Sequence, residues 1–330
     1  MELSLSLALA ACRGSGVPVG TLLKNLRLIM STEGTISVDR LLVAAPSLGL
    51  TTEAILTGVG ALAGGAPMAL TTTGAIDDLP IRIPGCLLWL DASDTGTITA
   101  SSGSVSQWDD KSGNDHHVAQ TAGAAQPTTG TRTIDGKNVI DFDSAYLTRD
   151  DALGLTGNPN FCMFCVVKLD TSVAIADGIM SVGSATDPTT GKVIGCCAGS
   201  DGYSYRYLDG NQVFNATVLG SAKLLNYCRA SGAQYGAGAL FVEGTSQSET
   251  SESNPTSTPN LADEHTSIGS LIKSDGSFDS FLIDGVVAEV LVYNTAMASA
   301  DRQLIEGYLA WKWGLEASLP SGHPYESSAP

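Results

Sequence analysis

The sequence predicts a mostly β protein: an antiparallel β-sandwich with one helix near its C-terminus, preceded by an N-terminal attachment segment. From residue 84 onward, short runs of β-branched and aromatic residues alternate with clusters of Gly, Asp, Asn and Ser, which is typical of a sandwich. One stretch, 299–313, repeats its apolar residues at helical spacing instead. All 4 Trp, 9 Tyr and 7 Phe residues lie in 81–330, so the core-forming part of the chain is expected there.

Residues 1–80 are predicted to be a docking or oligomerisation segment, because a segment without aromatic residues completes its core best against a partner. Its first residues, MELSLSLALAAC (1–12), alternate Leu with Ser and Ala, which favours a strand with one buried face. Residues 9–12 also spell a lipobox, Leu-Ala-Ala-Cys, but Glu2 stands where a signal peptide carries a positive charge. We therefore favour a strand that pairs with a partner's sheet or within an oligomer.

An uncharged run over 54–76 is long enough to cross a bilayer. It contains five Gly and one Pro, however, and no aromatic or basic anchors flank it. We expect a packed Ala/Gly interface here and no membrane partner.

The predicted sandwich domain, 81–330, contains several strand-like runs. They read LLWLD, KNVIDF, CMFCVVKL, IMSVG, KVIGCCAG, YSYRYLDG, ALFVEG and LIDGVVAEVLVYN. Residues 244–260 are polar and contain two Pro, which predicts a long loop. The helix over 299–313 is expected to have Ser299 as its N-cap and to end at Gly314.

The net charge of the chain bears on its binding partners, and its cysteine content bears on the cellular compartment in which it folds. The 34 acidic and 17 basic residues give a net charge of −17, which repels phosphate backbones, so we expect no nucleic-acid partner. The 7 Cys residues are odd in number and form no compact disulfide framework. Cys162 and Cys165 would point to opposite faces of a strand and could not share a metal. Buried, reduced thiols are expected, and with them folding in a reducing cytoplasm.

The order of several motifs resembles a known family. LLWLDASD (87–94), QWDDKSGNDHHVAQ (107–120), QPT (126–128) and NVIDFD (138–143) precede a C-terminal GVVAEVLVYNTAMASADRQLIEGYLAWKWGL and LPSGHPY. Over about 84–330 this is similar to a laminin-G-like, concanavalin-A-like sandwich domain of tailed-phage virion proteins and bacterial surface proteins. The resemblance implies a jelly-roll fold and a virion protein assembled in the host cytoplasm. The same fold carries lectins, glycosidases, adhesins and structural modules, so it does not assign a function.

Two groups of residues are candidate sites. Asp109, Asp110, Asn114 and Asp115 offer oxygen ligands for calcium, but the same loop composition favours a turn that caps its own backbone. We prefer the turn because the spacing and distal Glu of an EF-hand are missing.

The second group is Tyr203, Tyr205 and Tyr207, which alternate along one predicted strand and so share a face. An exposed tyrosine face would be a platform for sugar rings, whereas a half-buried face would pack on its neighbour.

No catalytic residue is predicted. A glycosidase needs two carboxylates roughly 5–10 Å apart, and no predicted strand carries alternating acids. Glu289, inside VVAEVLV, has no acid two positions to either side. None of the histidines lies in a nucleophile or zinc motif: His116, His117, His265 and His323.

We therefore expect a non-enzymatic virion structural protein, either a tail fibre or receptor-binding protein or a capsid decoration. Residues 1–80 would contact other virion proteins and support a homo-oligomer, and the sandwich would bind a host surface glycan through repeated weak contacts. Two alternatives remain. A bacterial surface adhesin or lipoprotein requires secretion, and a glycan hydrolase requires an acid pair contributed by separate strands.

Overall fold

The computed structural model describes two separate compact units of the chain, 1–74 and 75–330. Described residues are 27–30, 36–40, 78–170, 177–183, 193–199, 202–207, 210–214, 219–234, 237–253, 258–272, 277–278 and 281–330. In the first unit, β1 (Arg27–Met30) pairs antiparallel with β2 (Ile36–Arg40). The predicted opening strand, the lipobox and the uncharged run over 54–76 lie outside the described residues. No helix within the described ranges is long and apolar enough to cross a membrane.

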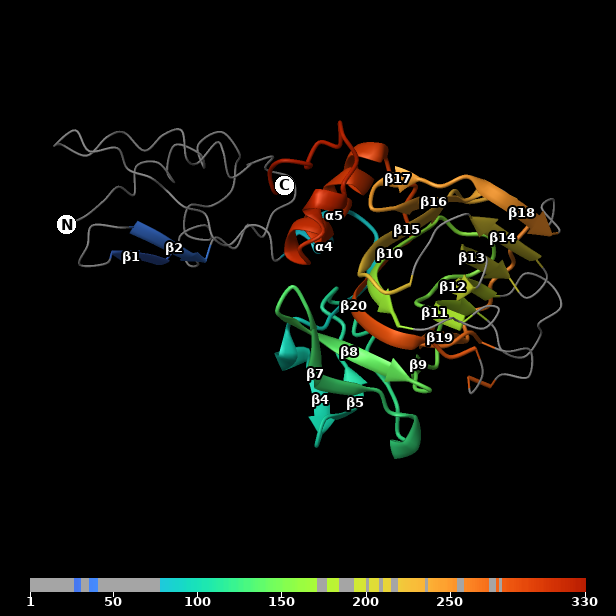
Figure 1. Cartoon of the computed structure of the whole chain (residues 1–330), viewed down its shortest axis with the longest axis horizontal. Coiled ribbons are helices and arrows are strands. Elements are labelled where there is room, and N and C mark those ends of the chain that lie inside the picture. Colours follow the sequence, from blue (N-terminus) through green and yellow to red (C-terminus); the bar gives the residue numbers. More distant parts are fainter. Residues whose placement is uncertain are drawn as a thin grey trace, which may run out of the picture. The chain divides into compact units, whose positions relative to one another are not determined.

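The second unit is mostly β, as predicted, with a large antiparallel sheet of 18 strands among the described residues and a short C-terminal helix (Figure 1). The strands are β3 (Cys86–Asp91), β4 (Ile98–Ser101), β5 (Ser104–Trp108), β6 (Val118–Ala119), β7 (Thr128–Ile134), β8 (Lys137–Asp143), β9 (Leu147–Arg149), β10 (Phe161–Leu169), β11 (Asp177–Gly183), β12 (Val193–Gly199), β13 (Gly202–Tyr207), β14 (Gly210–Phe214), β15 (Lys223–Arg229), β16 (Ala239–Val242), β17 (Thr245–Ser246), β18 (Glu249–Ser253), β19 (His265–Ile268) and β20 (Asp284–Tyr293). The α-helices are α4 (Leu79–Arg82) and α5 (Ser299–Lys312), and short 3₁₀ turns cover Thr95–Thr97, Gly123–Ala125 and Glu316–Ser318.

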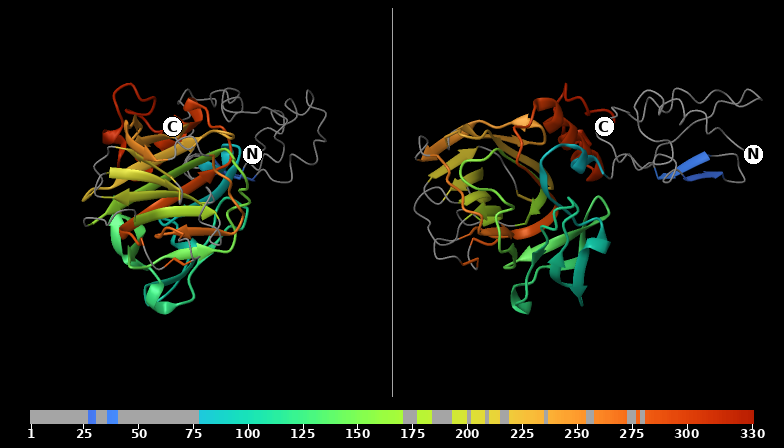
Figure 2. Two further views of the ribbon diagram at one scale, coloured as in Figure 1. Left: turned by 90° about the vertical axis from the view of Figure 1, so that its right-hand side faces the viewer. Right: turned by 180° about the vertical axis from the view of Figure 1, so that it is seen from behind.

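The sheet curls into the two layers of a sandwich. One layer runs β16–β15–β10–β20 and continues from β20 to β3 and β8. The other runs β9–β19–β11–β12–β13–β14–β18, and Figure 2 shows the strands curving around a common interior. Side chains of both layers meet in the main hydrophobic core, including Cys165 of β10 and Val182 of β11. The β-sandwich prediction is confirmed.

A second core lies on the outer face of the first layer, under α5. Phe164 and Leu291 from the sheet pack there with Ile305 and Leu309 from the helix, and Leu79 of α4 joins them. Because residues alternate along a strand, β10 and β20 supply both cores and are predominantly apolar. Glu289, one of the two acidic residues of β20, is fully buried and contacts α5.

Two local predictions need correction. Ser299 is the first helical residue rather than the N-cap, which is Ala298 and makes no side-chain cap; Gly314 ends the helix with φ 68°, as expected. The polar stretch 244–260 is not one loop, because it contains β17 and β18. β18 pairs with β14, so neighbouring backbone groups rather than apolar side chains stabilise it.

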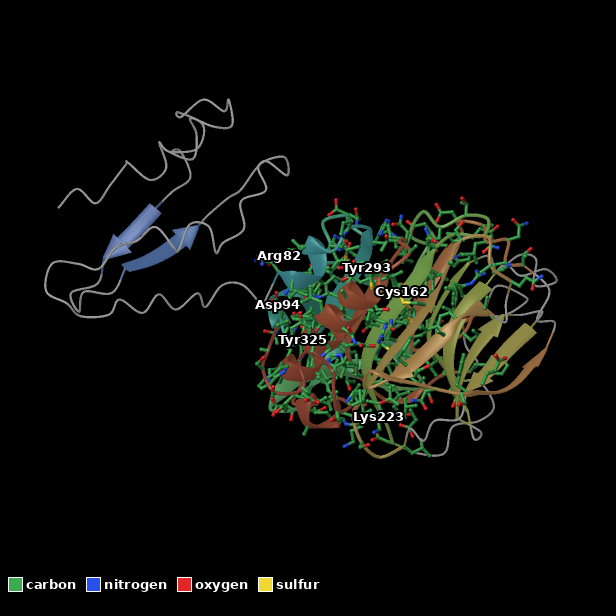
Figure 3. All side chains as sticks on the ribbon, turned by 90° about the horizontal axis from the view of Figure 1, so that it is seen from above. Arg82, Asp94, Cys162, Lys223, Tyr293 and Tyr325 are labelled. Atoms are coloured by element: carbon green, nitrogen blue, oxygen red, sulfur yellow. A yellow bond between two sulfur atoms is a disulfide. The ribbon has the colours of Figure 1, made fainter. Side chains whose placement is uncertain are left out.

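The cysteines of β10 point to opposite faces, since Cys162 lies in the second core and Cys165 in the main core. Cys162 stands opposite Cys228 of β15 and is joined to it by a disulfide (Figure 3). The expectation of reduced thiols is therefore wrong for this pair, whose cross-strand register the sequence does not reveal. Among the described residues, Cys86 and Cys165 are free.

Candidate functional site

The acidic residues of two neighbouring strands meet beneath the C-terminal end of α5. Glu289 of β20 is the register partner of Asp91 of β3, so the sheet places two carboxylates side by side. Helix α5 adds Lys312 from its last turn, where the helix dipole favours a positive charge. The loop after β5 adds Lys111, which lies 3.0 Å from Asp91 Oδ2.

Glu289 is fully buried and its carboxylate accepts four hydrogen bonds. Trp89 Nε1 and the Tyr308 hydroxyl donate to Oε1 at 2.7 and 2.8 Å. Trp313 Nε1 and Lys312 Nζ lie 2.7 Å from Oε2. Trp and Lys side chains are donors only, so these bonds are satisfied by the ionised carboxylate. Each oxygen of Glu289 thus has two donors.

Lys312 bridges the two carboxylates. Its Nζ lies 2.8 Å from Asp91 Oδ2 and 2.7 Å from Glu289 Oε2, which brings these oxygens within about 5.5 Å of each other. The two carboxyl groups are therefore no farther apart than the acid pair of retaining glycosidases, whose members are about 5–5.5 Å apart. The third hydrogen of the ammonium is directed to the Tyr308 hydroxyl at 3.0 Å. The two acids are thus close enough to act together, but an ammonium group is bonded between them.

The net pKa shift differs in direction between the two acids. Burial raises the pKa of Glu289 above its ordinary value, an effect that Lys312 only partly offsets and that the nearby Asp91 charge increases. Burial would also raise the pKa of Asp91, but Lys312, Ser93 and Lys111 outweigh it and hold this pKa below the usual range. Asp91 is therefore the acid that the lysines keep charged most firmly.

A pocket of about 300 Å³ opens beside this network. It is lined by Asp91, Ser93, Asp94, Lys111 and Lys312. Glu289 is not part of the lining, and Asp91 is only 3% exposed. The accessible groups are therefore those of the rim, not the acid pair.

The rim has one half-exposed carboxylate and one ammonium. Asp94 Oδ2 lies 2.9 Å from Lys111 Nζ, and the two side chains are 44% and 22% exposed. Lys111 also covers the ring of Trp89, 4.4 Å from its centroid. Asp94 is labelled in Figure 3.

The acid-rich loop predicted as a turn or a calcium site forms a turn fixed to β3. Asp110 Oδ1 accepts from the backbone N–H groups of Trp89 and Ser112, each at 2.8 Å. Its Oδ2 accepts from the Ser112 hydroxyl at 2.6 Å and from the His116 N–H at 3.0 Å. Both carboxylate oxygens of Asp110 therefore hold backbone in place.

The other three proposed calcium ligands do not share the contacts of Asp110. Asn114 donates to the carbonyls of Cys86 and Leu87, Asp109 accepts from a glutamine amide, and the Asp115 side chain is 91% exposed. Across the described residues, no group of three or more His, Cys, Asp or Glu side chains could hold a metal ion. Calcium binding by Asp109, Asp110, Asn114 and Asp115 stays a prediction.

The tyrosine run forms strand β13, as predicted. Tyr203 pairs in register with Phe214 of β14. The side chains of Tyr203, Tyr205 and Tyr207 lie outside the described part, so their role as a sugar platform stays a prediction.

The C-terminal motif closes the fold. Within α5, buried Glu306 pairs with Arg302 and lies 3.3 Å from His323 Nε2. Trp311 Nε1 donates to the Tyr325 carbonyl at 2.9 Å, so the last residues are tied back onto the helix. Several residues of the C-terminal motif therefore hold the chain end against the helix.

The sequence did not reveal the acid pair because its members lie in strands that are remote in the chain. The available signal was an isolated acid within an apolar run, Glu289, together with the donor-rich helix end YLAWKW. A buried carboxylate requires donors, and these residue types supply them.

Comparisons with known proteins add the following. No family model matches the chain. A search of curated proteins also found no match.

Among solved structures, the chain is similar to a Trypanosoma rangeli sialidase in complex with 2,3-difluorosialic acid, at 12% identity and a TM-score of 0.45. The match covers 70% of this chain and 34% of that one, so the chain spans about a third of the sialidase's length. It is also similar to domain 4 of AbnA, an extracellular arabinanase from Geobacillus stearothermophilus, in complex with arabinotriose. That match has 9% identity and a TM-score of 0.43 over 66% of this chain and 96% of that one.

A third similar structure is the CBM40 of Ruminococcus gnavus IT-sialidase bound to α2,3-sialyllactose, at 12% identity and a TM-score of 0.34. It covers 44% of this chain and 80% of that chain. Likenesses at this level carry no argument about function, and the β-sandwich assignment rests on the strand topology.

Proposed function

We propose that this chain is a non-enzymatic structural protein of a tailed-phage virion, which displays a glycan-binding β-sandwich outward. It would serve as a tail fibre or receptor-binding protein or as a capsid decoration. Residues 1–80 would dock it on other virion proteins or on further copies of itself.

One observation carries the non-enzymatic part of the proposal. Asp91 and Glu289 are close together, but Lys312 is bonded between the two acids and Glu289 is fully buried. A retaining mechanism needs one acid as nucleophile and the other as proton donor at the sugar. Both roles require access that a fully bonded Glu289 does not have. The pair is better explained as a clamp between sheet and helix.

The glycan-binding part is supported by the polar pocket next to this clamp and by the family resemblance of residues 84–330. A shallow polar site gives weak binding, but several copies on one particle raise the overall affinity without a deep pocket. Host attachment through repeated weak contacts fits this arrangement.

Full-length protein on an array of neutral and acidic surface glycans tests the proposal. We expect retention of at least one glycan class, with signal that rises steeply with glycan density on the array, as multivalent attachment requires. Absence of binding to every glycan at high density would contradict the glycan-binding role.

A further inference from the structure

The pocket beside the clamp has free hydrogen-bonding capacity at its rim. Lys111 Nζ has three hydrogens and is bonded within the described residues only to Asp91 and Asp94, so one donor is unused. Asp94 Oδ2 is bonded to this ammonium, whereas Oδ1 makes no hydrogen bond to any described residue. A free donor and a free acceptor thus stand next to each other on one ion pair.

The charged groups that line the pocket indicate which net charge a ligand should carry. Its lining holds two carboxylates, Asp91 and Asp94, and two ammonium groups, Lys111 and Lys312. These formal charges cancel within the lining, although Lys312 is also bonded to the buried Glu289 behind it and the chain carries a net charge of −17. An anion would lie against the carboxylates, and a cation against the ammonium groups. A neutral ligand that both donates and accepts avoids both costs.

We infer that this rim binds one neutral sugar unit through two adjacent hydroxyl groups. One hydroxyl oxygen accepts from Lys111 Nζ, and the neighbouring hydroxyl donates to Asp94 Oδ1. Ser93 lies within the same lining, and its hydroxyl donates to Asp91 Oδ1 at 2.6 Å, which leaves its oxygen lone pairs as further acceptors. The inference rests on the proposed glycan-binding function and assigns its site.

The size of the pocket agrees with a single sugar unit. A volume of about 300 Å³ is at the lower end of small-molecule pockets, which run from roughly 300 to 1,000 Å³. Trp89, the nearest aromatic ring, is buried and covered by Lys111, so ring stacking adds nothing and each site is weak. This is the regime in which repeated display increases the overall affinity.

The test compares Asp94→Ala with Asp150→Ala in the full-length protein. Asp150 is a matched control because it loses the same charge from a side chain that is 98% exposed and outside the pocket. The glycan with the strongest array signal serves as probe, and isothermal titration gives the dissociation constant. Since hydrogen bonds to charged groups contribute about 1.5–3 kcal/mol, we expect Asp94→Ala to weaken binding roughly 10- to 100-fold. Asp150→Ala should bind like the wild type, and thermal unfolding should confirm that both variants are folded.

Three outcomes decide between the claims. Loss of binding in Asp94→Ala alone, with a neutral glycan as probe, supports the site. Unchanged binding in Asp94→Ala, or a wild type that binds only acidic glycans, overturns the site but leaves the glycan-binding function standing. A wild type that binds no glycan overturns both.

Discussion

At the scale of single residues, Glu289 is the most informative side chain of the sandwich. An acid in the middle of an apolar strand suggests catalysis, because burying a carboxylate is costly without partners. Its four donors supply those partners and come from β3, from α5 and from the C-cap residue of α5, Trp313. The residue therefore fastens helix to sheet, and its removal should affect stability rather than activity.

Glu289→Gln should lower the free energy of unfolding by about 1–3 kcal/mol, because the amide NH2 group must face buried Trp, Tyr or Lys donors and leaves them without an acceptor, although Lys312 keeps Asp91 as its charge partner. Equilibrium urea unfolding of the wild type and the variant measures the change. A loss below about 1 kcal/mol would show that the carboxylate is not the clamp that its hydrogen bonds describe.

Asp91 should give the sandwich a stability contribution that depends on pH. Its pKa is lowered in the folded protein, because Lys312, Ser93 and Lys111 outweigh the opposing effect of burial. The contribution is therefore present above the unfolded pKa near 4 and is lost as pH falls through the lower folded value. The difference in unfolding free energy between the wild type and Asp91→Asn should be large at pH 6 and smaller at pH 3. A difference that grows on acidification would contradict this sign.

At the scale of elements, α5 and the residues after it act as one closing unit. The helix covers the outer face of the first layer, and the chain end is bonded back to it through Trp311 and His323. Gly307 lies where the two parts meet, since a Cβ atom there would be 2.7 Å from Tyr325 Cγ. The tight contact explains a glycine in the middle of a helix.

Gly307→Ala should therefore destabilise the protein although Ala is the better helix former. Overpacking against Tyr325 costs roughly 1–3 kcal/mol and outweighs the gain of about 1 kcal/mol in helix propensity. Gly123→Ala is the control, because its added methyl group would meet nothing within 4 Å. Thermal unfolding should show a lower midpoint for Gly307→Ala only; equal midpoints would mean that the chain end does not pack on the helix.

The elements also show how far sequence reasoning extends. Short runs rich in β-branched and aromatic residues predicted strands such as β10 and β20, and apolar residues at helical spacing predicted α5, because both patterns are local in the sequence. The polar strand β18 was missed because its backbone partner β14 stabilises it. The Asp91–Glu289 pair and the Cys162–Cys228 disulfide were missed for the same kind of reason: each depends on strand register between remote segments.

At the scale of the whole molecule, the predicted division into a docking segment and a sandwich is open to a direct test. The compact sandwich unit spans 75–330, and Leu79 of α4 belongs to its second core. A fragment that begins at residue 75 retains this helix, so this is the fragment whose properties should be compared with those of the full chain.

We expect the 75–330 fragment to be folded and monomeric, and the full chain to be an oligomer, when both masses are measured by light scattering. Monomers in both cases would mean that the N-terminal segment docks on a different protein, as a decoration or anchor would. Precipitation of the fragment would contradict the two-part division.

The most direct test of the central claim asks whether a glycan that the protein binds is recovered intact. Wild-type protein and Glu289→Gln are incubated with the strongest array ligand, and the glycan is analysed by chromatography and mass spectrometry. The account predicts intact glycan from both samples, because Glu289 is buried and bonded to four donors. Cleavage by the wild type that the folded Glu289→Gln variant abolishes would contradict it and identify a hydrolase.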